Sequence, residues 1–314
     1  MRRFLIKISI FVLPIAVVVL GVELYLSSYK SAFQTKAQYI KENEDKIECL
    51  VLGSSHNQNA INPEYIKNLN VANLAYSGQD LKLDFLLLKE FQHLPKLKIV
   101  IIELAYHGLE NATSPGYDRN TIYLRFYKIN NFDRTPRLLD YSIFLSNPGM
   151  YTSFLNPFME KIPVNKYGFV AELCDLEKSI HRFKNAQYDT AYLYKTRVNM
   201  FTTRHNTESI DNFNNNTRFF ENMIQMCLNH KLKVLVITPP LYKTYYELIN
   251  ANKKKRTEQF IARAKSKFPS IVYKDFSTGD GFSVYDFMNY DHLNPVGAEK
   301  FSKIIDSVLQ NIQN

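Results

Sequence analysis

The chain has 314 residues, of which 46% are apolar and 22% charged, a composition typical of a globular protein and not of a disordered one. The net charge of +9 suits an anionic membrane or glycan. Apart from Lys253–Arg256, interpreted as a solvated helix face, no compact Lys/Arg stripe stands out, so nucleic acid is not expected as a partner. The three cysteines, Cys49, Cys174 and Cys227, form no Cys-x-x-Cys pair, so neither a zinc site nor a disulfide framework is indicated.

The N-terminus carries an apolar run from Ile8 to Val22 that follows two arginines and Lys7. With the apolar residues on either side, the run reaches the ~20 residues that a bilayer requires, so residues 4–26 are predicted to be a transmembrane signal anchor. Positive charge before the run predicts a cytoplasmic N-terminus and a chain that is extracytoplasmic after it. A cleaved signal peptide is the competing interpretation, but no clear Ala-x-Ala site follows.

Residues 27–46 are polar and rich in Lys and Glu, which predicts a linker or stalk helix before a domain over 47–314. Short apolar segments then alternate with helical ones, as the buried strands of a parallel sheet do. The predicted strands are 48–52, 71–74, 98–104, 233–238 and 271–273. The alternation stops between about 105 and 216, where a large, mostly helical insertion is expected. Five strands with intervening helices predict a three-layer α/β sandwich.

Polar residues follow two of these strands, at the edge of a parallel sheet where ligands bind. Ser55 comes directly after the first strand and is the candidate nucleophile, although a Ser that caps the next helix is the simpler interpretation. Asn73 and Gly78 end and follow the second strand, as candidate loop-tying and substrate-binding residues. His292, just before the last helix, is the candidate general base.

The segments 50–56, 73–78 and 289–301 resemble the motifs of the SGNH (GDSL-like) hydrolase superfamily. The resemblance implies a flavodoxin-like α/β fold, Ser55 as nucleophile, the Gly78 N–H at the oxyanion and His292 as base. The N-terminal anchor, the insertion and Ser54 in place of the usual Asp resemble the membrane-tethered branch. That branch includes polysaccharide O-acetylation proteins and the D-alanyl-transfer protein of teichoic acid synthesis.

Two positions depart from the family pattern. Asn289 stands where the family has its acid, and Asp291, next to His292, is expected to struggle to reach the same ring, while Asp286 lies further back. This leaves a dyad oriented by Asn289, a triad with an acid from elsewhere, or a decayed site.

The third family motif, with its oxyanion Asn, is missing after the third strand. Tyr106, His107 and Asn111 are the alternative donors there.

The sequence therefore predicts a membrane-anchored, serine-dependent O-acyltransferase or carboxylic ester hydrolase, with its domain in the periplasm or at the cell surface. Its partners would be a glycan or acyl-ester substrate and a membrane-embedded acyl donor protein, with no metal or organic cofactor. The alternative is a non-catalytic glycan-binding or assembly protein of the cell envelope. The enzyme interpretation predicts that Ser55 Oγ and His292 lie about 2.6–4 Å apart.

Overall fold

The computed structural model describes residues 1–28, 31–111, 119–148, 164–170, 183–196, 203 and 205–313. The chain divides into two compact units. Unit 1 is Met1–Gln34 with Ser114–Lys161, and unit 2 is Thr35–Thr113 with Ile162–Asn314. Cys174 and His181 fall outside the described residues.

Unit 2 is built on a sheet of five parallel strands in the order β2-β1-β3-β4-β5. The predicted α/β fold with a central parallel sheet of about five strands is confirmed, with strand bounds that differ by at most two residues. The strands are β1 (Cys49–Leu52), β2 (Val71–Asn73), β3 (Ile99–Glu103), β4 (Lys233–Thr238) and β5 (Val272–Asp275). The first three are buried at every position, although β2 lies at the edge of the sheet, because helices cover both faces.

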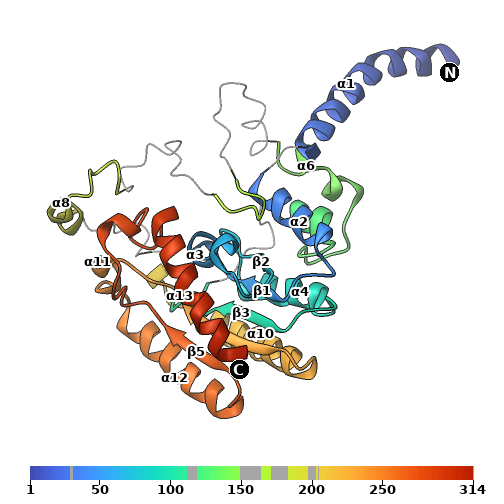
Figure 1. Cartoon of the computed structure of the whole chain (residues 1–314). Coiled ribbons are helices and arrows are strands. Elements are labelled where there is room, and N and C mark those ends of the chain that lie inside the picture. Colours follow the sequence, from blue (N-terminus) through green and yellow to red (C-terminus); the bar gives the residue numbers. More distant parts are fainter. Residues whose placement is uncertain are drawn as a thin grey trace. The chain divides into compact units, whose positions relative to one another are not determined.

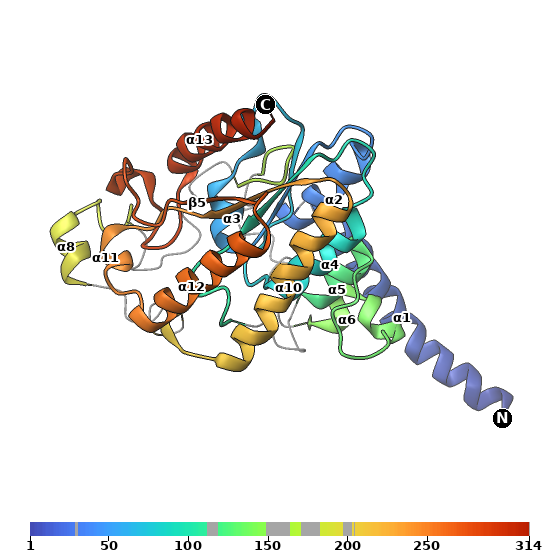
Figure 2. The same ribbon diagram turned by 90° about the horizontal axis from the view of Figure 1, so that it is seen from below.

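Helices cover both faces of this sheet (Figures 1 and 2). One layer holds α3 (Ser55–Ala60) and α13 (Pro295–Gln313), which pack against each other. The opposite layer holds α4 (Leu81–Phe91), α10 (Ile210–Asn229) and α12 (Ala251–Lys267). The shorter elements of unit 2 are η1 (Pro63–Tyr65), α8 (Thr190–Lys195), α11 (Lys243–Tyr246) and η4 (Val284–Asp286).

The stretch expected to be a linker contains a packed helix, α2 (Ala32–Glu42). Phe33, Lys36 and Ile40 on this helix are buried. The polar composition of the segment suggested a solvated stalk, but a helix needs only one buried face, and these three residues recur at intervals of three and four. Residues 32–42 are therefore part of the folded body.

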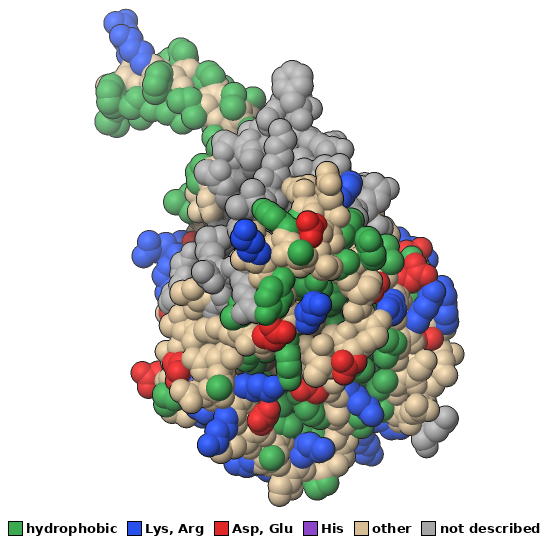
Figure 3. All heavy atoms as spheres, turned by 90° about the vertical axis from the view of Figure 1, so that its left-hand side faces the viewer, with side chains coloured by type: hydrophobic (Ala, Val, Ile, Leu, Met, Phe, Trp, Pro, Cys, Tyr) green, Lys and Arg blue, Asp and Glu red, His purple; other side chains and the backbone are tan. Residues whose placement is uncertain are grey.

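Unit 1 contains α1 (Arg2–Ser28), the first residues of α2, α5 (Asn120–Tyr127), η2 (Leu138–Tyr141) and α6 (Ile143–Ser146). Helix α1 is long and apolar enough to cross a membrane, and none of its most apolar stretch is buried against the protein. Apolar side chains run along α1, and basic side chains lie at its N-terminal end (Figure 3). The described part of the predicted insertion is helical in 120–127, 143–146 and 190–195.

Candidate active site

Ser55 lies at the first turn of α3, directly after the end of β1. Gly53 makes this turn with a φ of +139°, and a Cβ at this position would lie 2.5 Å from the Cβ of Glu103. Only glycine combines this backbone conformation with so close an approach. The Gly53 N–H donates to Asp84 Oδ1 at 2.9 Å, and Ser54 caps α3. The sharp turn presents Ser55 at the carboxyl edge of the sheet.

Glu103, the last residue of β3, fastens this turn from the neighbouring strand. Its carboxylate accepts the Ser54 N–H at 2.8 Å, the Ser54 hydroxyl at 2.6 Å and the Asn57 N–H at 3.0 Å. Three hydrogen bonds to one buried carboxylate hold the segment around Ser55 in place. Glu103 is a candidate positioning residue that the sequence interpretation did not assign, although a lone carboxylate at the end of an apolar strand was a visible signal.

His292 lies in a tight loop before α13. The Met288 N–H donates to the His292 carbonyl at 2.9 Å, and Phe287 pairs with Leu293 in an antiparallel bridge, so the loop is closed at its base. The side chain of Asn294 accepts the N–H groups at the start of α13, those of Val296 and Gly297. These contacts place His292 at the sheet edge that carries Ser55.

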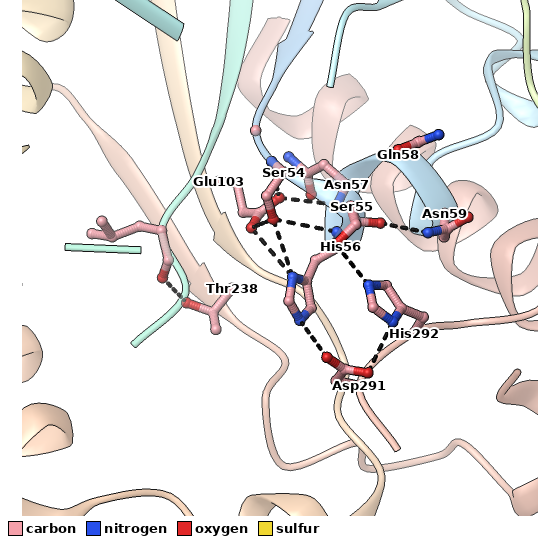
Figure 4. Close-up of polar contacts among 12 residues, drawn as sticks. Ser54, Ser55, His56, Asn57, Gln58, Asn59, Glu103, Thr238, Asp291 and His292 are labelled. Atoms are coloured by element: carbon pink, nitrogen blue, oxygen red, sulfur yellow. Dashed lines mark hydrogen bonds and ion pairs between the residues drawn. The ribbon is translucent and has the colours of Figure 1, made fainter. Parts of the chain in front are cut away.

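The two predicted residues meet directly. Ser55 Oγ lies 2.7 Å from His292 Nε2, within the expected range (Figure 4). On the other side of the ring, Asp291 Oδ1 lies 2.8 Å from Nδ1. The expectation that Asp291 would struggle to reach this ring is therefore wrong. In an extended strand neighbouring side chains point to opposite faces, but the closed loop turns both toward one side.

Asn289 supports this arrangement through its amide oxygen. Oδ1 accepts the backbone N–H of Asp291 at 3.2 Å and of His292 at 2.9 Å, and lies 3.1 Å from His292 Nδ1. Two acceptors, Asn289 Oδ1 and Asp291 Oδ1, thus face the single Nδ1 proton. The carboxylate is the closer and stronger acceptor, and the amide shapes the loop.

The side chains of Ser55, His292 and Asp291 differ in how far they are buried. Ser55 and His292 are partly exposed, whereas the Asp291 side chain is only 2% exposed. Burial by itself would raise the pKa of the Asp291 carboxyl, but the charge of His292 and its hydrogen bond to the carboxylate oppose burial and contribute most to holding that pKa below its usual range. The site therefore presents a hydroxyl toward solvent and keeps an ionised carboxylate behind the imidazole.

A second imidazole, His56, faces the other oxygen of Asp291. Its Nε2 lies 3.8 Å from Asp291 Oδ2, and its Nδ1 lies 3.1 Å from Ser54 Oγ (Figure 4). The Ser54 hydroxyl donates its one proton to Glu103, so it accepts from His56 Nδ1–H, and the Nε2 of neutral His56 carries no proton. Burial and the nearby His292 both lower the pKa of His56, which favours this neutral form.

His56 belongs to a row of four histidine rings. Ring centroids are 4.8 Å apart for His292 and His56, 4.7 Å for His56 and His107, and 4.1 Å for His107 and His205. Burial, followed by these neighbours, lowers the pKa of His107 well below its usual value. Because a charge on one ring disfavours a charge on the next, the neutral forms of His56 and His107 are favoured. The sequence interpretation did not find this row, since its members are far apart in the chain.

The other predicted site residues lie in the loop after β2. Asn73 donates to the carbonyls of Asn57 and Ile61 and accepts the Ala75 N–H, so its amide ties this loop to α3. Gly78 has a φ of +78°. Its loop is fastened at residues on either side of Ser55, because Tyr76 N–H donates to the Gly53 carbonyl and Ser77 N–H to Gln58.

The three alternative oxyanion donors have other contacts. The Tyr106 hydroxyl donates to Tyr245 at 3.1 Å, His107 stacks in the histidine row, and the carbonyl of Asn111 accepts from Asn216. None of these contacts directs a donor toward Ser55.

Two sets of side chains have ligand atoms close enough to hold a metal ion: His56 with Glu103 and His107, and His56 with Asp291 and His292. In each set the carboxylate already accepts protein hydrogen bonds, from Ser54 and Asn57 or from His292. A metal on the second set would compete with the contacts that link His292 to Asp291. The hydrogen-bond pattern favours acid–base chemistry over metal binding here.

A cavity of about 550 Å³ lies elsewhere in unit 2, between the start of α4 and α10. Its lining includes Asp80, which caps α4, and Asn216, whose amide binds three backbone carbonyls. Neither Ser55 nor His292 lines it. The candidate site is therefore defined by Ser55, His292 and their neighbours, and not by this cavity.

No family model and no curated protein matches the sequence. Among solved structures, the chain is similar to a candidate platelet activating factor from Streptococcus pneumonia, at 10% identity and a TM-score of 0.43 over 96% of this chain and 99% of that one. It is also similar to a GDSL-like lipase from Bacteroides thetaiotaomicron, at 10% identity and a TM-score of 0.38, covering 90% and 98% of the two chains. A third is a candidate acylhydrolase from Bacteroides fragilis, at 9% identity and a TM-score of 0.40, covering 88% and 96%. Likeness at this level leaves the activity to be argued from the side chains around Ser55.

Proposed function

We propose that the chain is a serine-dependent acyl-transfer enzyme of the SGNH type. One observation carries the proposal: Ser55 Oγ lies 2.7 Å from His292 Nε2, and Asp291 Oδ1 lies 2.8 Å from the other ring nitrogen. A hydroxyl, an imidazole and a carboxylate in this order are the groups that activate a serine for attack on an ester.

In the proposed reaction Ser55 Oγ attacks the carbonyl carbon of an acyl ester while His292 Nε2 takes its proton. Asp291 stabilises the imidazolium, and Asn289 keeps the loop and the ring oriented. His292 then gives the proton to the departing alcohol, which leaves an acyl-Ser55 ester. The backbone N–H groups of Ser55 and Gly78 are the proposed donors to the oxyanion. An acceptor hydroxyl, deprotonated by His292, releases the acyl group and restores Ser55.

The proposed acceptor is a hydroxyl of a cell-surface polysaccharide, which would make the chain an O-acyltransferase; with water as acceptor it is an esterase. Helix α1 supports the transferase, because an apolar helix of this length would hold the site beside a membrane-embedded acyl donor protein. The proposed location is the cytoplasmic membrane, crossed once, with unit 2 in the periplasm or at the cell surface.

Labelling by a fluorophosphonate tests the chemistry. The wild-type chain should be labelled at Ser55 and should hydrolyse an activated acetyl ester, and Ser55→Ala should lose both. Ser307→Ala, on the exposed face of α13, is the matched control and should keep both. An unlabelled wild-type chain of intact fold would contradict the enzyme and leave the alternative, a non-catalytic glycan-binding or assembly protein.

A second measurement separates transfer from hydrolysis. With an acetyl ester as donor and an oligosaccharide as acceptor, a transferase should form acetylated oligosaccharide faster than free acetate. Free acetate alone, formed by a chain that labels at Ser55, would identify an esterase.

A further inference from the structure

After α1, the described part of unit 1 exposes its large apolar side chains in one short segment. Leu138 is 88% exposed, Leu139 61%, Tyr141 48% and Leu145 42%. These four residues of η2 and α6 are called here the Leu138 patch. Exposed apolar clusters of this kind mark surfaces that bind another protein or a membrane.

The segment that carries the Leu138 patch is fastened to the end of α1. The carboxylate of Glu23, in the last turns of α1, accepts the Ser142 hydroxyl at 2.9 Å and the N–H groups of Ile143 and Phe144 at 2.9 and 3.0 Å. Arg125 of α5 binds the same carboxylate and also donates to Ser27 at 2.7 Å. Both ribbon views show α6 beside this end of α1 (Figures 1 and 2).

The residue that holds this segment is also the first charge after the apolar run of α1. The chain has no charged residue between Lys7 and Glu23, and the apolar side chains there are exposed. If α1 crosses a bilayer, its hydrocarbon-facing part ends at Glu23, because a charged side chain is costly deeper in the membrane. Contacts to Glu23 therefore hold η2 and α6 at the depth where acyl chains meet headgroups.

We propose that the Leu138 patch inserts into the phospholipid bilayer at the interface where α1 leaves it. The occupant is lipid and not a protein, because contacts to Glu23 fix the segment of the patch to the helix end that itself emerges from lipid. Leucines and a tyrosine are residue types suited to this boundary, where an aromatic ring with a polar hydroxyl is favoured. The inference rests on the proposed membrane anchor. The Leu138 patch would give unit 1 a second contact with the bilayer besides α1. This contact would restrict rotation of unit 1 about the long axis of α1.

The chain contains no Trp, so a single introduced Trp reports on one site. Leu139→Trp and Leu145→Trp place it at exposed positions of the Leu138 patch that can accept a larger ring. The full chain is reconstituted in phosphatidylcholine vesicles, with and without lipid brominated near the headgroup end of its acyl chains. We expect blue-shifted emission from both variants and at least a twofold loss of emission with the brominated lipid.

Two further variants serve as controls. Leu13→Trp in α1 should be quenched by lipid brominated deeper in the chain, which tests the anchor itself, and Tyr285→Trp, exposed on η4 of unit 2, gives the emission of an exposed Trp in this chain. Quenching at Leu13 with water-exposed, unquenched emission at both 139 and 145 would overturn the inference and leave the anchor standing. Blue-shifted emission without bromine quenching would overturn it in favour of a protein partner or a second copy. Lack of quenching at Leu13 would overturn the anchor and the inference together.

Discussion

Three imidazoles face Asp291: His292 lies at Oδ1, and His56 and His205 lie at Oδ2. Only His292 is close enough for a hydrogen bond, and neutral His56 has no proton to offer from Nε2. The carboxylate is therefore committed to the imidazole that contacts Ser55. Its lowered pKa keeps it ionised throughout the range in which an imidazole titrates.

Replacing this carboxylate should change both the rate and its pH dependence. An ionised Asp291 favours protonated His292, so Asp291→Asn should move the acid limb of kcat/KM to lower pH. It should also reduce kcat by roughly 10²–10⁴, because the imidazolium of the transition state loses its counter-charge. Rates on an activated acetyl ester between pH 4 and 9 measure both effects.

Asp211→Asn, at the exposed start of α10, removes one negative charge away from the site and should leave the profile unchanged. An Asp291→Asn variant with wild-type kcat and an unmoved acid limb would exclude Asp291 as the acid of the site.

The Asn289→Asp variant tests whether the candidate site is a dyad without an acid or a triad that uses Asp291. In a dyad without an acid this change would raise the activity, since it supplies the missing carboxylate. Because Asp291 already contacts His292 Nδ1 at 2.8 Å, we expect unchanged or lower turnover: the change places a second negative charge beside the first. A gain of tenfold or more in kcat would show that Asp291 does not serve His292.

At this scale the sequence predicted Ser55 and His292 as partners, because each lies in a motif at an element boundary. It did not predict Asp291, since the direction of a side chain in a loop depends on backbone closure between Met288 and His292. Glu103 and His56 were missed for a different reason: their contacts join separate strands and helices.

Among the elements, α2 shows how a polar segment can belong to the core. Lys36 is 3% exposed, and its Nζ donates to the Ala75 carbonyl at 2.7 Å, in the loop that leads to Gly78. Burial lowers the pKa of Lys36 to about 7. The hydrogen bond of Lys36 thus ties α2 to the loop after β2, and the amine loses its proton near neutral pH.

This buried lysine should make stability depend on pH in a specific direction. Between pH 7 and 10 the unfolded chain keeps the Lys36 proton and the folded chain does not, so the free energy of unfolding rises with pH. The contribution is on the order of 1 kcal/mol per pH unit in that window. Lys36→Met, which keeps the apolar stem, should lose this rise in the free energy of unfolding. Lys89→Met, at an exposed position of α4, should keep it.

Denaturant unfolding of the full chain in detergent at pH 7, 8.5 and 10 would measure the difference. Parallel pH dependences for the wild-type chain and Lys36→Met would mean that Lys36 is charged in the fold.

The sequence predicted the strands well because a strand buried on both faces leaves a run of apolar residues that little else produces. It predicted helix ends less well. Helix α10 begins at Ile210, inside the segment expected to be an insertion, because Ser209 caps a first stretch in which asparagines interrupt the apolar pattern. The burial of α2 was not predicted either, because its buried positions include a lysine.

For the whole molecule, the orientation in the membrane decides which substrates unit 2 can meet. Basic residues precede the apolar run and Glu23 follows it, so the chain after α1 should be extracytoplasmic. Alkaline phosphatase, which is active only after export, should therefore be active when fused after residue 40. A fusion after residue 3 is the matched control and should be inactive.

A fusion after residue 40 that is abundant but inactive would place unit 2 in the cytoplasm. It would also remove cell-surface polysaccharide as the acceptor while leaving the chemistry at Ser55 untouched.

At this scale the sequence predicted one domain after a linker, whereas residues 114–161 group with the N-terminal helix and not with the sheet. Such a grouping depends on contacts like that of Arg125 with Glu23, 102 residues apart in the chain. Periodicity is a local property and carries no information about them.

The contact between Ser55 and His292 spans 237 residues of sequence. Its consequence concerns timing during synthesis. Ser55 leaves the ribosome long before His292, which follows all five strands of the sheet. A nascent chain that ends between these two residues displays Ser55 without its candidate base, so reactivity can begin only after His292 has been made. The order of residues along the chain thus delays the proposed activity until all five strands have been synthesised.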